Sequence, residues 1–170
     1  KTPIQVTSSG VPLSGEMLER LQSLGHIELN LSLNSSSEPG RKKLYGEKAH
    51  MNAVAVAARL AEAGISFNGS IVAMPHVVGW QDIEETVLYL ADKGAETVRL
   101  FMPGYTRFGK PPFPPADIRP AMADFAAAVR RKTAVPVLVE PPVLADLSAV
   151  VEGVIRMTPG SAAGIRAGDR

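Results

Sequence analysis

The chain has 170 residues, of which 45% are hydrophobic, and its formal net charge is +1. This length fits one ordinary domain, or one domain and part of another, with enough apolar residues for a core. The balanced charge argues against a nucleic-acid partner, and no apolar run is long enough to cross a bilayer. We therefore expect a cytoplasmic protein that binds neither nucleic acid nor membrane. Cysteine is absent, which excludes disulfides and thiolate metal sites within these residues.

The predicted secondary structure alternates short apolar strands with helices. In chain order, the strands span residues 4–9, 27–33, 65–75, 97–103 and 135–142, and the helices span residues 13–25, 49–63, 80–94 and 115–132. Ser14 is the predicted N-cap of the first helix, and Gly25 ends it. The second helix is expected to bury the face that carries Val54, Ala57, Ala58 and Ala61. This alternation is typical of an α/β fold with a mainly parallel sheet that is buried on both faces.

Small polar side chains and cations follow the carboxyl ends of the first two predicted strands. Parallel sheets bind their ligands at that edge. Hydroxyl and amide groups suit sugar oxygens, and an arginine suits a carboxylate. The candidate rim residues are Thr7, Ser8, Ser9, Ser32, Asn34, Arg41 and Arg107. Ordinary loop chemistry is the alternative, because Asn and Ser also form turns and surface arginines are usually solvated.

Several other chemistries lack their motifs. His26, His50 and His76 do not have the spacing of metal ligands. His76 follows a predicted strand and is either a rim residue or an ordinary loop histidine. Neither "GxxxxGK[ST]" nor "GxGxxG" is present, which argues against a nucleoside-triphosphate or dinucleotide site.

Residues 4–109 resemble the second half of a radical S-adenosylmethionine enzyme. The resemblance rests on the order of "TSSG", "SLNSSSEPGRKKLYG" and an "AGI" strand that ends in a proline turn before an acidic helix start. It is strongest toward iron–sulfur oxidoreductases that carry a PDZ-like segment. The resemblance implies that residues 1–140 form a partial (β/α) barrel of parallel strands with flanking helices, which begins at the family's third strand.

The resemblance also implies a function and two cofactors. The family reductively cleaves S-adenosylmethionine to a 5′-deoxyadenosyl radical, which abstracts hydrogen from a substrate that this sequence does not identify. Its 4Fe-4S cluster is held by "CxxxCxxC", which is absent here. We therefore expect the cluster ligands in a preceding segment and no redox chemistry from this chain alone. A relative that has lost the cluster is the alternative.

The resemblance assigns S-adenosylmethionine contacts to particular residues. Thr7, Ser8, Ser32 and Asn34 are expected at the ribose or methionine, Arg41 at the carboxylate, and Met102 and Pro103 at the adenine edge. An exposed strand near residues 4–7 is further expected to favour dimerisation through the sheet edge.

Residues 150–170 resemble the opening of a bacterial PDZ-like module, with residues 141–149 as a linker. The matching residues are Pro159, Gly160, Ser161, Ala162, Gly164, Ile165, Gly168 and Asp169. The pattern predicts a strand over residues 151–157 and a tight turn over residues 160–166 that Ser161 caps. A simple hairpin is the other interpretation. Such a module would bind a peptide or protein, so a non-catalytic scaffold is the alternative to the enzyme.

Overall fold

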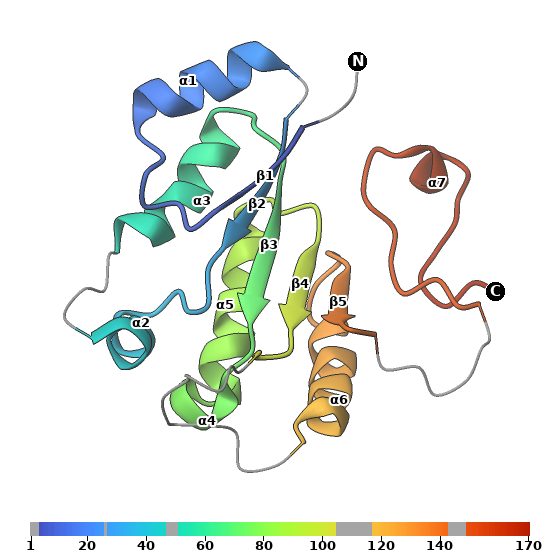
Figure 1. Cartoon of the computed structure of the whole chain (residues 1–170). Helices are drawn as coiled ribbons and strands as arrows, with labels where there is room; N and C mark the ends of the chain where they lie inside the picture. The colour runs from blue at the N-terminus through green and yellow to red at the C-terminus, as the bar shows by residue number, and fades with distance from the viewer. Residues whose placement is uncertain (1–3, 26, 47–50, 105–116, 143–148) are drawn as a thin grey trace.

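The computed structural model describes residues 4–25, 27–46, 51–104, 117–142 and 149–170. Its centre is a sheet with the strand order β1-β2-β3-β4-β5, in which every neighbouring pair is parallel (Figure 1). The strands are β1 (Ile4–Ser8), β2 (Ile27–Ser32), β3 (Phe67–Val72), β4 (Val98–Phe101) and β5 (Val137–Glu140). All five lie within the predicted ranges, so the expected parallel α/β sheet is confirmed.

One face of the sheet is covered by helices. They are α1 (Gly15–Leu24), α3 (Asn52–Glu62), α5 (Trp80–Asp92) and α6 (Arg119–Arg130), and α3, α5 and α6 lie behind the sheet in Figure 1. The shared core contains Leu18, Val56, Leu60, Val87, Leu90, Met122 and Val129 from the helices and Leu29, Leu31, Phe67, Ile71, Leu100 and Val139 from the strands. None of the described helices is long and apolar enough to cross a membrane.

Burial of the sheet on both faces was expected, and it is wrong for three strands: no residue of β1 is buried, and β4 and β5 are buried on one face. Val98, Leu100, Val137 and Val139 are buried, whereas the residues that alternate with them are only partly buried. Successive strand residues point to opposite faces, so the second face of these strands remains accessible. A closed barrel would turn this face toward its interior.

Local signals explain where the first helix starts and stops. Ser14 Oγ accepts a hydrogen bond from the backbone N–H of Met17 at 3.2 Å, as predicted for its N-cap. Gly25 ends the helix with φ of 67°, a left-handed conformation that glycine adopts without steric cost. Both predictions are confirmed.

The buried face of α3 differs from the predicted one. Its buried residues are Ala53, Val56, Ala57 and Leu60. Of the predicted face, Ala57 is buried, Val54 and Ala58 are partly buried, and Ala61 is exposed. The i, i+3, i+4, i+7 spacing from Ala53 places the large Leu60 side chain in the core, which decides the rotation of the helix.

Two short helices follow β2 and β3. After β2, the residue pattern alone indicated a polar loop, but residues 38–45 form a helix. In α2 (Glu38–Tyr45), Ser37 Oγ caps the first turn by accepting from the Gly40 N–H at 3.0 Å. Pro39 lies in that turn, where its missing N–H costs no helical hydrogen bond. Lys42 and Lys43 lie in the last turn, where the helix dipole favours positive charge. A one-turn helix, α4 (Pro75–Val78), follows β3 and contacts α2.

The carboxyl-terminal segment does not contain the predicted strand. Residues 151–157 have no strand geometry, and a short helix, α7 (Pro159–Ala162), follows them. The segment is closed instead by two backbone bonds, Val151 N–H to Asp169 O at 2.9 Å and Gly168 N–H to Val151 O at 2.8 Å. Thr158, rather than Ser161, caps α7, because its Oγ1 accepts the Ser161 N–H.

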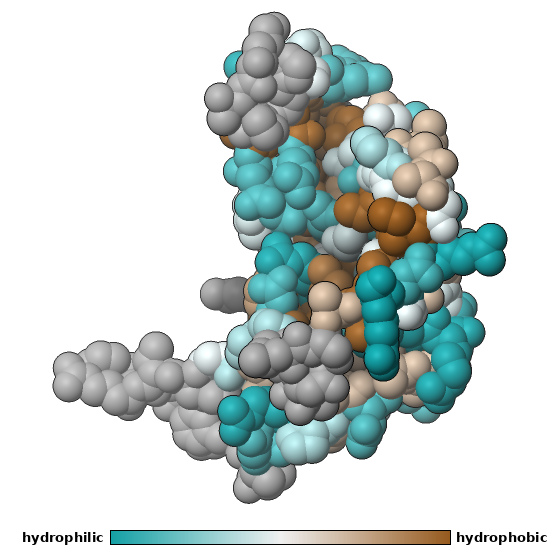
Figure 2. Space-filling view, turned by 90° about the vertical axis from the view of Figure 1, so that its right-hand side faces the viewer, coloured by the Kyte–Doolittle hydropathy of each residue, from teal (hydrophilic) through white to brown (hydrophobic). Residues whose placement is uncertain are grey.

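This segment packs at the amino ends of β4 and β5. A shallow pocket of about 260 Å³ lies there between Val135, Pro136, Val154, Ile155 and Met157, among other residues. Figure 2 looks at the side on which α7 lies in Figure 1, and brown hydrophobic side chains gather in the middle of that face between teal ones. Residues 143–148 of the predicted linker lie outside the described residues.

Candidate functional site

The open face of the sheet carries rows of polar side chains. The strand register aligns one row from Thr7 through Asn30 to Asn68, a second through Ser32, Ser70, Arg99 and Leu138, and a third through Val72, Phe101 and Glu140. These positions alternate with the buried apolar residues, so they share the face opposite the helices. Because all strands are parallel, the third row lies nearest the carboxyl ends.

Asn30 and Asn68 of the first row are buried, and Asn68 takes part in a hydrogen-bond network. Asn68 Nδ2 donates to Glu28 Oε1 at 2.8 Å, and Thr97 Oγ1 donates to Asn68 Oδ1 at 2.7 Å. Asn30 is only 6% exposed, and its Oδ1 has no hydrogen-bond partner in the part of the chain that the structure describes. A buried acceptor without a partner is costly, so this oxygen is suited to a ligand or water donor.

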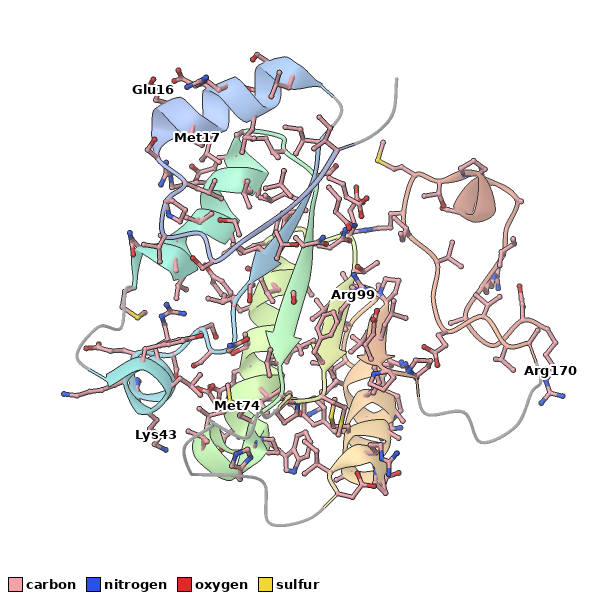
Figure 3. The ribbon with its side chains drawn as sticks, viewed as in Figure 1. Glu16, Met17, Lys43, Met74, Arg99 and Arg170 are labelled. Carbon is pink, nitrogen blue, oxygen red and sulfur yellow. The ribbon has the colours of Figure 1, made fainter. Side chains whose placement is uncertain are left out.

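The rows nearer the carboxyl ends contain a charged pair, Arg99 and Glu140. Arg99 Nε donates to Glu140 Oε1 at 2.6 Å, and Arg99 Nη2 forms an ion pair with the same oxygen. The guanidinium carbon also lies 5.1 Å from the centre of the Phe101 ring. Both charged side chains are about a third exposed, at 32% and 31%. Figure 3 labels Arg99 among the side chains of the sheet. This pair was not among the predicted site residues, although a charge that alternates with apolar strand residues is a signal for it.

The loop after β2 is held to β3 by Asn34. Its Oδ1 accepts the Val72 backbone N–H at 2.9 Å, and its Nδ2 donates to the Tyr45 hydroxyl at 3.0 Å. Asn34 was predicted to contact the ribose, but both the oxygen and the nitrogen of its side-chain amide already have a hydrogen-bond partner. Its oxygen still has a second lone pair with which to accept another hydrogen bond.

Arg41 lies in α2 and is only 5% exposed. Its Nη1 donates to the Ser35 carbonyl at 3.3 Å, and its guanidinium stacks 5.1 Å from the centre of the Tyr45 ring. Its Nε is buried and has no hydrogen-bond partner among the described residues. Arg41, which was predicted to bind the cofactor carboxylate, thus has one N–H donor, Nε, without a hydrogen-bond partner among the described residues.

Hydroxyl groups join the start of α2 to α5. Ser37 Oγ donates to Asp82 Oδ1, and Thr86 Oγ1 accepts the Ser36 N–H at 2.9 Å. Asp82 lies in the first turn of α5, where the helix dipole favours a negative charge. These contacts fix the loop after β2 against the first two turns of α5.

The remaining predicted residues lie at three strand ends. Thr7 and Ser8 are at the end of β1, where Ser8 Oγ accepts the Gly10 N–H at 3.1 Å, and Ser32 is partly buried at the end of β2. Thr7, Ser8 and Ser32 therefore lie on neighbouring strands. Met102 and Pro103 follow β4, so β3 separates them from that group. The Met102 N–H donates to the Glu140 carbonyl at 2.9 Å.

Three other predicted candidates can be located or set aside. Ser9 directly follows β1, and His76 lies in α4 at the end of β3. Arg107 lies outside the described residues. Among those that are described, no group of three His, Asp or Glu side chains could hold a metal ion.

Comparison with known proteins shows the fold. No protein-family model matches the chain, and no curated protein does. Streptococcus suis SuiB bound to S-adenosylmethionine is similar, with a TM-score of 0.62 and 16% identity over 80% of this chain and 31% of SuiB. SuiB bound to the precursor peptide SuiA gives a TM-score of 0.61 and 15% identity over the same shares. SuiB in a further structure gives 0.63 and 13% over 87% of this chain and 37% of SuiB.

The five parallel strands and flanking helices thus match part of the SuiB fold. The chain spans about a third of the SuiB chain.

Proposed function

We propose that this chain supplies part of the cofactor and substrate rim of a cytoplasmic radical S-adenosylmethionine enzyme. The main support is the group of hydroxyl and amide side chains at the carboxyl ends of β1 and β2, together with Arg41 in the helix that follows β2. Ligands bind at this edge in parallel α/β barrels. The likeness to SuiB, which was solved with S-adenosylmethionine, supports the same placement.

The residues present are chemically suited to S-adenosylmethionine. Thr7, Ser8 and Ser32 offer hydroxyls to the ribose or methionine, and Asn34 offers the free lone pair of Oδ1. The unpartnered Arg41 Nε is the donor that a methionine carboxylate would approach. The backbone at Met102 and Pro103 is assigned to the adenine edge. When bound, the cofactor supplies the hydrogen-abstracting chemistry, and the role of these residues is to bind and orient it.

The residues present do not suit an iron–sulfur cluster. The sequence has no cysteine, and clusters of this kind are held by cysteine thiolates. The proposal therefore places the cluster ligands outside these residues and assigns no electron transfer to them. The coding sequence upstream of Lys1 tests this point, because a three-cysteine motif is expected there. A start codon directly before Lys1 would contradict the enzyme assignment.

Binding of S-adenosylmethionine tests the rim. We expect saturable binding to this chain in equilibrium dialysis and an affinity that is about 2- to 10-fold lower for Ser32→Ala, the loss of one neutral hydrogen bond. Arg41→Ala should lower the affinity by roughly 10- to 100-fold, because its bond is to a charged group. Ser23→Ala is the matched control, since its hydroxyl donates to the Arg20 carbonyl within α1. Equal affinities of the Ser32, Arg41 and Ser23 variants would contradict the assignment.

The carboxyl-terminal segment remains proposed as the start of a PDZ-like module that binds a peptide or protein. Its supporting feature is the closure of residues 151–169 by the two backbone bonds of Val151. A non-catalytic scaffold built from the half barrel and this segment is the second candidate. It predicts peptide binding by the chain and no binding of S-adenosylmethionine, so the dialysis experiment separates the two functions.

A further inference from the structure

Arg99, Phe101 and Glu140 form a charged cluster on the open face, outside the residues assigned to S-adenosylmethionine. Arg99 and Phe101 are two residues apart on β4, and Glu140 is paired with Phe101 on the neighbouring strand. The Arg99 side chain therefore runs toward the carboxyl end of the sheet to reach Glu140. Both of its hydrogen-bonding contacts go to one oxygen, Oε1.

Stabilisation of the fold is a weak explanation for this pair. Ion pairs exposed to this degree stabilise proteins little, because solvent screens them and the side chains lose freedom. The core of the same two strands is built separately by Val98, Leu100, Val137 and Val139 on the other face. A charged pair that is not needed for the core, and that lies on the accessible face of the sheet, is suited to binding.

We propose that Arg99 and Glu140 recognise a substrate that carries a carboxylate and an ammonium group on one carbon, as an amino acid does. This inference rests on the proposed function only in taking the open face as the substrate face. Arg99 would donate hydrogen bonds to the substrate carboxylate, and Glu140 would accept hydrogen bonds from its ammonium group. The Phe101 ring contacts the Arg99 guanidinium and helps to hold it in position.

Charge balance favours this class over singly charged substrates. A ligand with only a carboxylate would compete with Glu140 for the guanidinium and place two negative charges side by side, which is unfavourable. A ligand with only an ammonium group would compete with Arg99 for the Glu140 carboxylate and place two positive charges side by side, which is also unfavourable. A ligand with both charges replaces one ion pair by two, so every charged group keeps an opposite partner.

The guanidinium also has spare capacity. It carries five N–H donors in a fixed planar arrangement, and its contacts with Glu140 engage Nε and Nη2. The donors that remain can meet a ligand carboxylate while the Glu140 contact is kept or rearranged. Glu140 Oε2 makes no contact with Arg99 in this geometry, so it offers an acceptor for an ammonium group.

Nuclear magnetic resonance titration of the full chain tests the inference without S-adenosylmethionine. The probes are alanine, propionate and ethylammonium, which carry both charges, only the carboxylate and only the ammonium group. We expect a saturable shift of the Arg99 Nε–H signal with alanine, with a Kd at least fivefold lower than with either other probe. Arg99→Gln and Glu140→Gln should each weaken alanine binding at least fivefold, as followed by the Phe101 amide signal.

Lys132→Gln is the matched control, because Lys132 forms an ion pair with Glu84 elsewhere in the chain. It should leave alanine binding unchanged, and a preserved amide spectrum shows that each variant is folded. Arg99→Lys serves if Arg99→Gln fails to fold, since it keeps the charge without the planar donors. Absence of a saturable shift, or equal affinity for alanine and propionate, would overturn the inference.

Addition of S-adenosylmethionine then separates this inference from the proposed function. Displacement of alanine from Arg99 by S-adenosylmethionine would show that the pair holds the cofactor's own amino-acid group, and would overturn the substrate assignment. Alanine binding without any S-adenosylmethionine binding would support the pair and contradict the cofactor rim. Simultaneous binding of both would support both proposals.

Discussion

Asn34 Oδ1 accepts the backbone N–H of Val72, and this bond fastens the loop after β2 to the last residue of β3. The loop carries Ser35 to Ser37 and leads into α2, so the position of Arg41 depends on it. A side chain that was predicted as a ligand contact therefore also acts as a structural clip.

The first prediction follows from this bond. Asn34→Ala removes the acceptor of the partly buried Val72 N–H and should lower the free energy of unfolding by about 1–3 kcal/mol. Urea unfolding followed by circular dichroism measures this loss. Asn34→Asp keeps the acceptor and should cost less than Asn34→Ala, and Tyr45→Phe removes only the other contact. A loss of stability in Tyr45→Phe as large as in Asn34→Ala would show that the Val72 bond is not the important one.

Gly40 carries the second prediction, because two opposing effects act on it. Alanine is favoured over glycine in a helix by roughly 1 kcal/mol. At Gly40, however, an added Cβ would lie 2.8 Å from Asp82 Cγ and still closer to Ser35 Oγ and Asp82 Oδ1. The overpacking should win, so that Gly40→Ala lowers the free energy of unfolding by about 1–3 kcal/mol.

Gly15 at the start of α1 provides the control for Gly40. Among the described residues a Cβ there would meet only Arg59 Nη2, at 3.8 Å, so Gly15→Ala should be neutral or slightly stabilising. Thermal unfolding of both variants measures the difference. A stabilised Gly40→Ala protein would mean that the Ser37–Asp82 cluster is looser than the structure describes.

The third prediction concerns the contact between the carboxyl-terminal segment and the sheet. A Cβ on Gly153 would lie 2.8 Å from Pro136 Cβ and 3.1 Å from Pro136 Cα. Gly153→Ala should therefore push the segment away from Pro136 and raise the rate of tryptic cleavage after Arg156 several-fold. Gly160→Ala is the control, because its nearest atom outside neighbouring residues would be 3.8 Å away. Equal cleavage of the two variants would argue against this packing.

The fourth prediction concerns the carboxyl of Asp117. Its pKa lies below the ordinary value because the Arg119 side chain donates hydrogen bonds to it, at 2.8 and 2.9 Å from Nε, and the Arg119 backbone N–H donates another. A lowered pKa in the folded state means that the associated stability is present above the unfolded pKa of about 3.9. That stability is lost as the pH falls through the lower folded value.

Carbon-13 titration of Asp117 measures this shift. Arg119→Gln should return the pKa toward about 3.9, the value for an isolated aspartate. Arg131→Gln is the control, because Arg131 donates to the Ala127 carbonyl and is not among the groups that shift the pKa of Asp117. A pKa in the wild-type chain at or above the ordinary value would contradict the assigned contacts.

The elements that the sequence predicted well are those whose signals are local. Ser14 and Gly25 determine the ends of α1 through their own hydrogen bond and backbone conformation, and each strand is a short apolar run. The order of the strand ends then follows from parallel pairing alone. This is why Thr7 and Ser32 could be placed on neighbouring strands before any contact was known.

The features that the sequence did not reveal depend on pairing between distant residues. Arg99 and Glu140 are 41 residues apart, and only the β4–β5 register brings them together. The burial of Arg41 likewise depends on Tyr45 and Ser35 folding around it. The predicted strand at 151–157 failed for the same reason, since a strand needs a partner, and the described residues instead pair Val151 with Gly168 and Asp169.

The last prediction concerns the exposed edge at β1. Within the described residues β1 pairs only with β2, and Ile4 is 58% exposed. An unpaired edge strand with an apolar side chain favours strand addition by a second chain. We therefore expect self-association that increases with concentration in sedimentation velocity experiments.

Ile4→Lys should weaken this association roughly tenfold or more. It removes an isoleucine side chain that the association would bury, and it places two like charges at the edge of a symmetric pair. Leu24→Lys is the matched control, since Leu24 is 60% exposed at the end of α1 and away from the strand edge. If both variants associate as strongly as the wild-type chain, the edge is not the interface. A monomer at all concentrations would contradict the prediction directly.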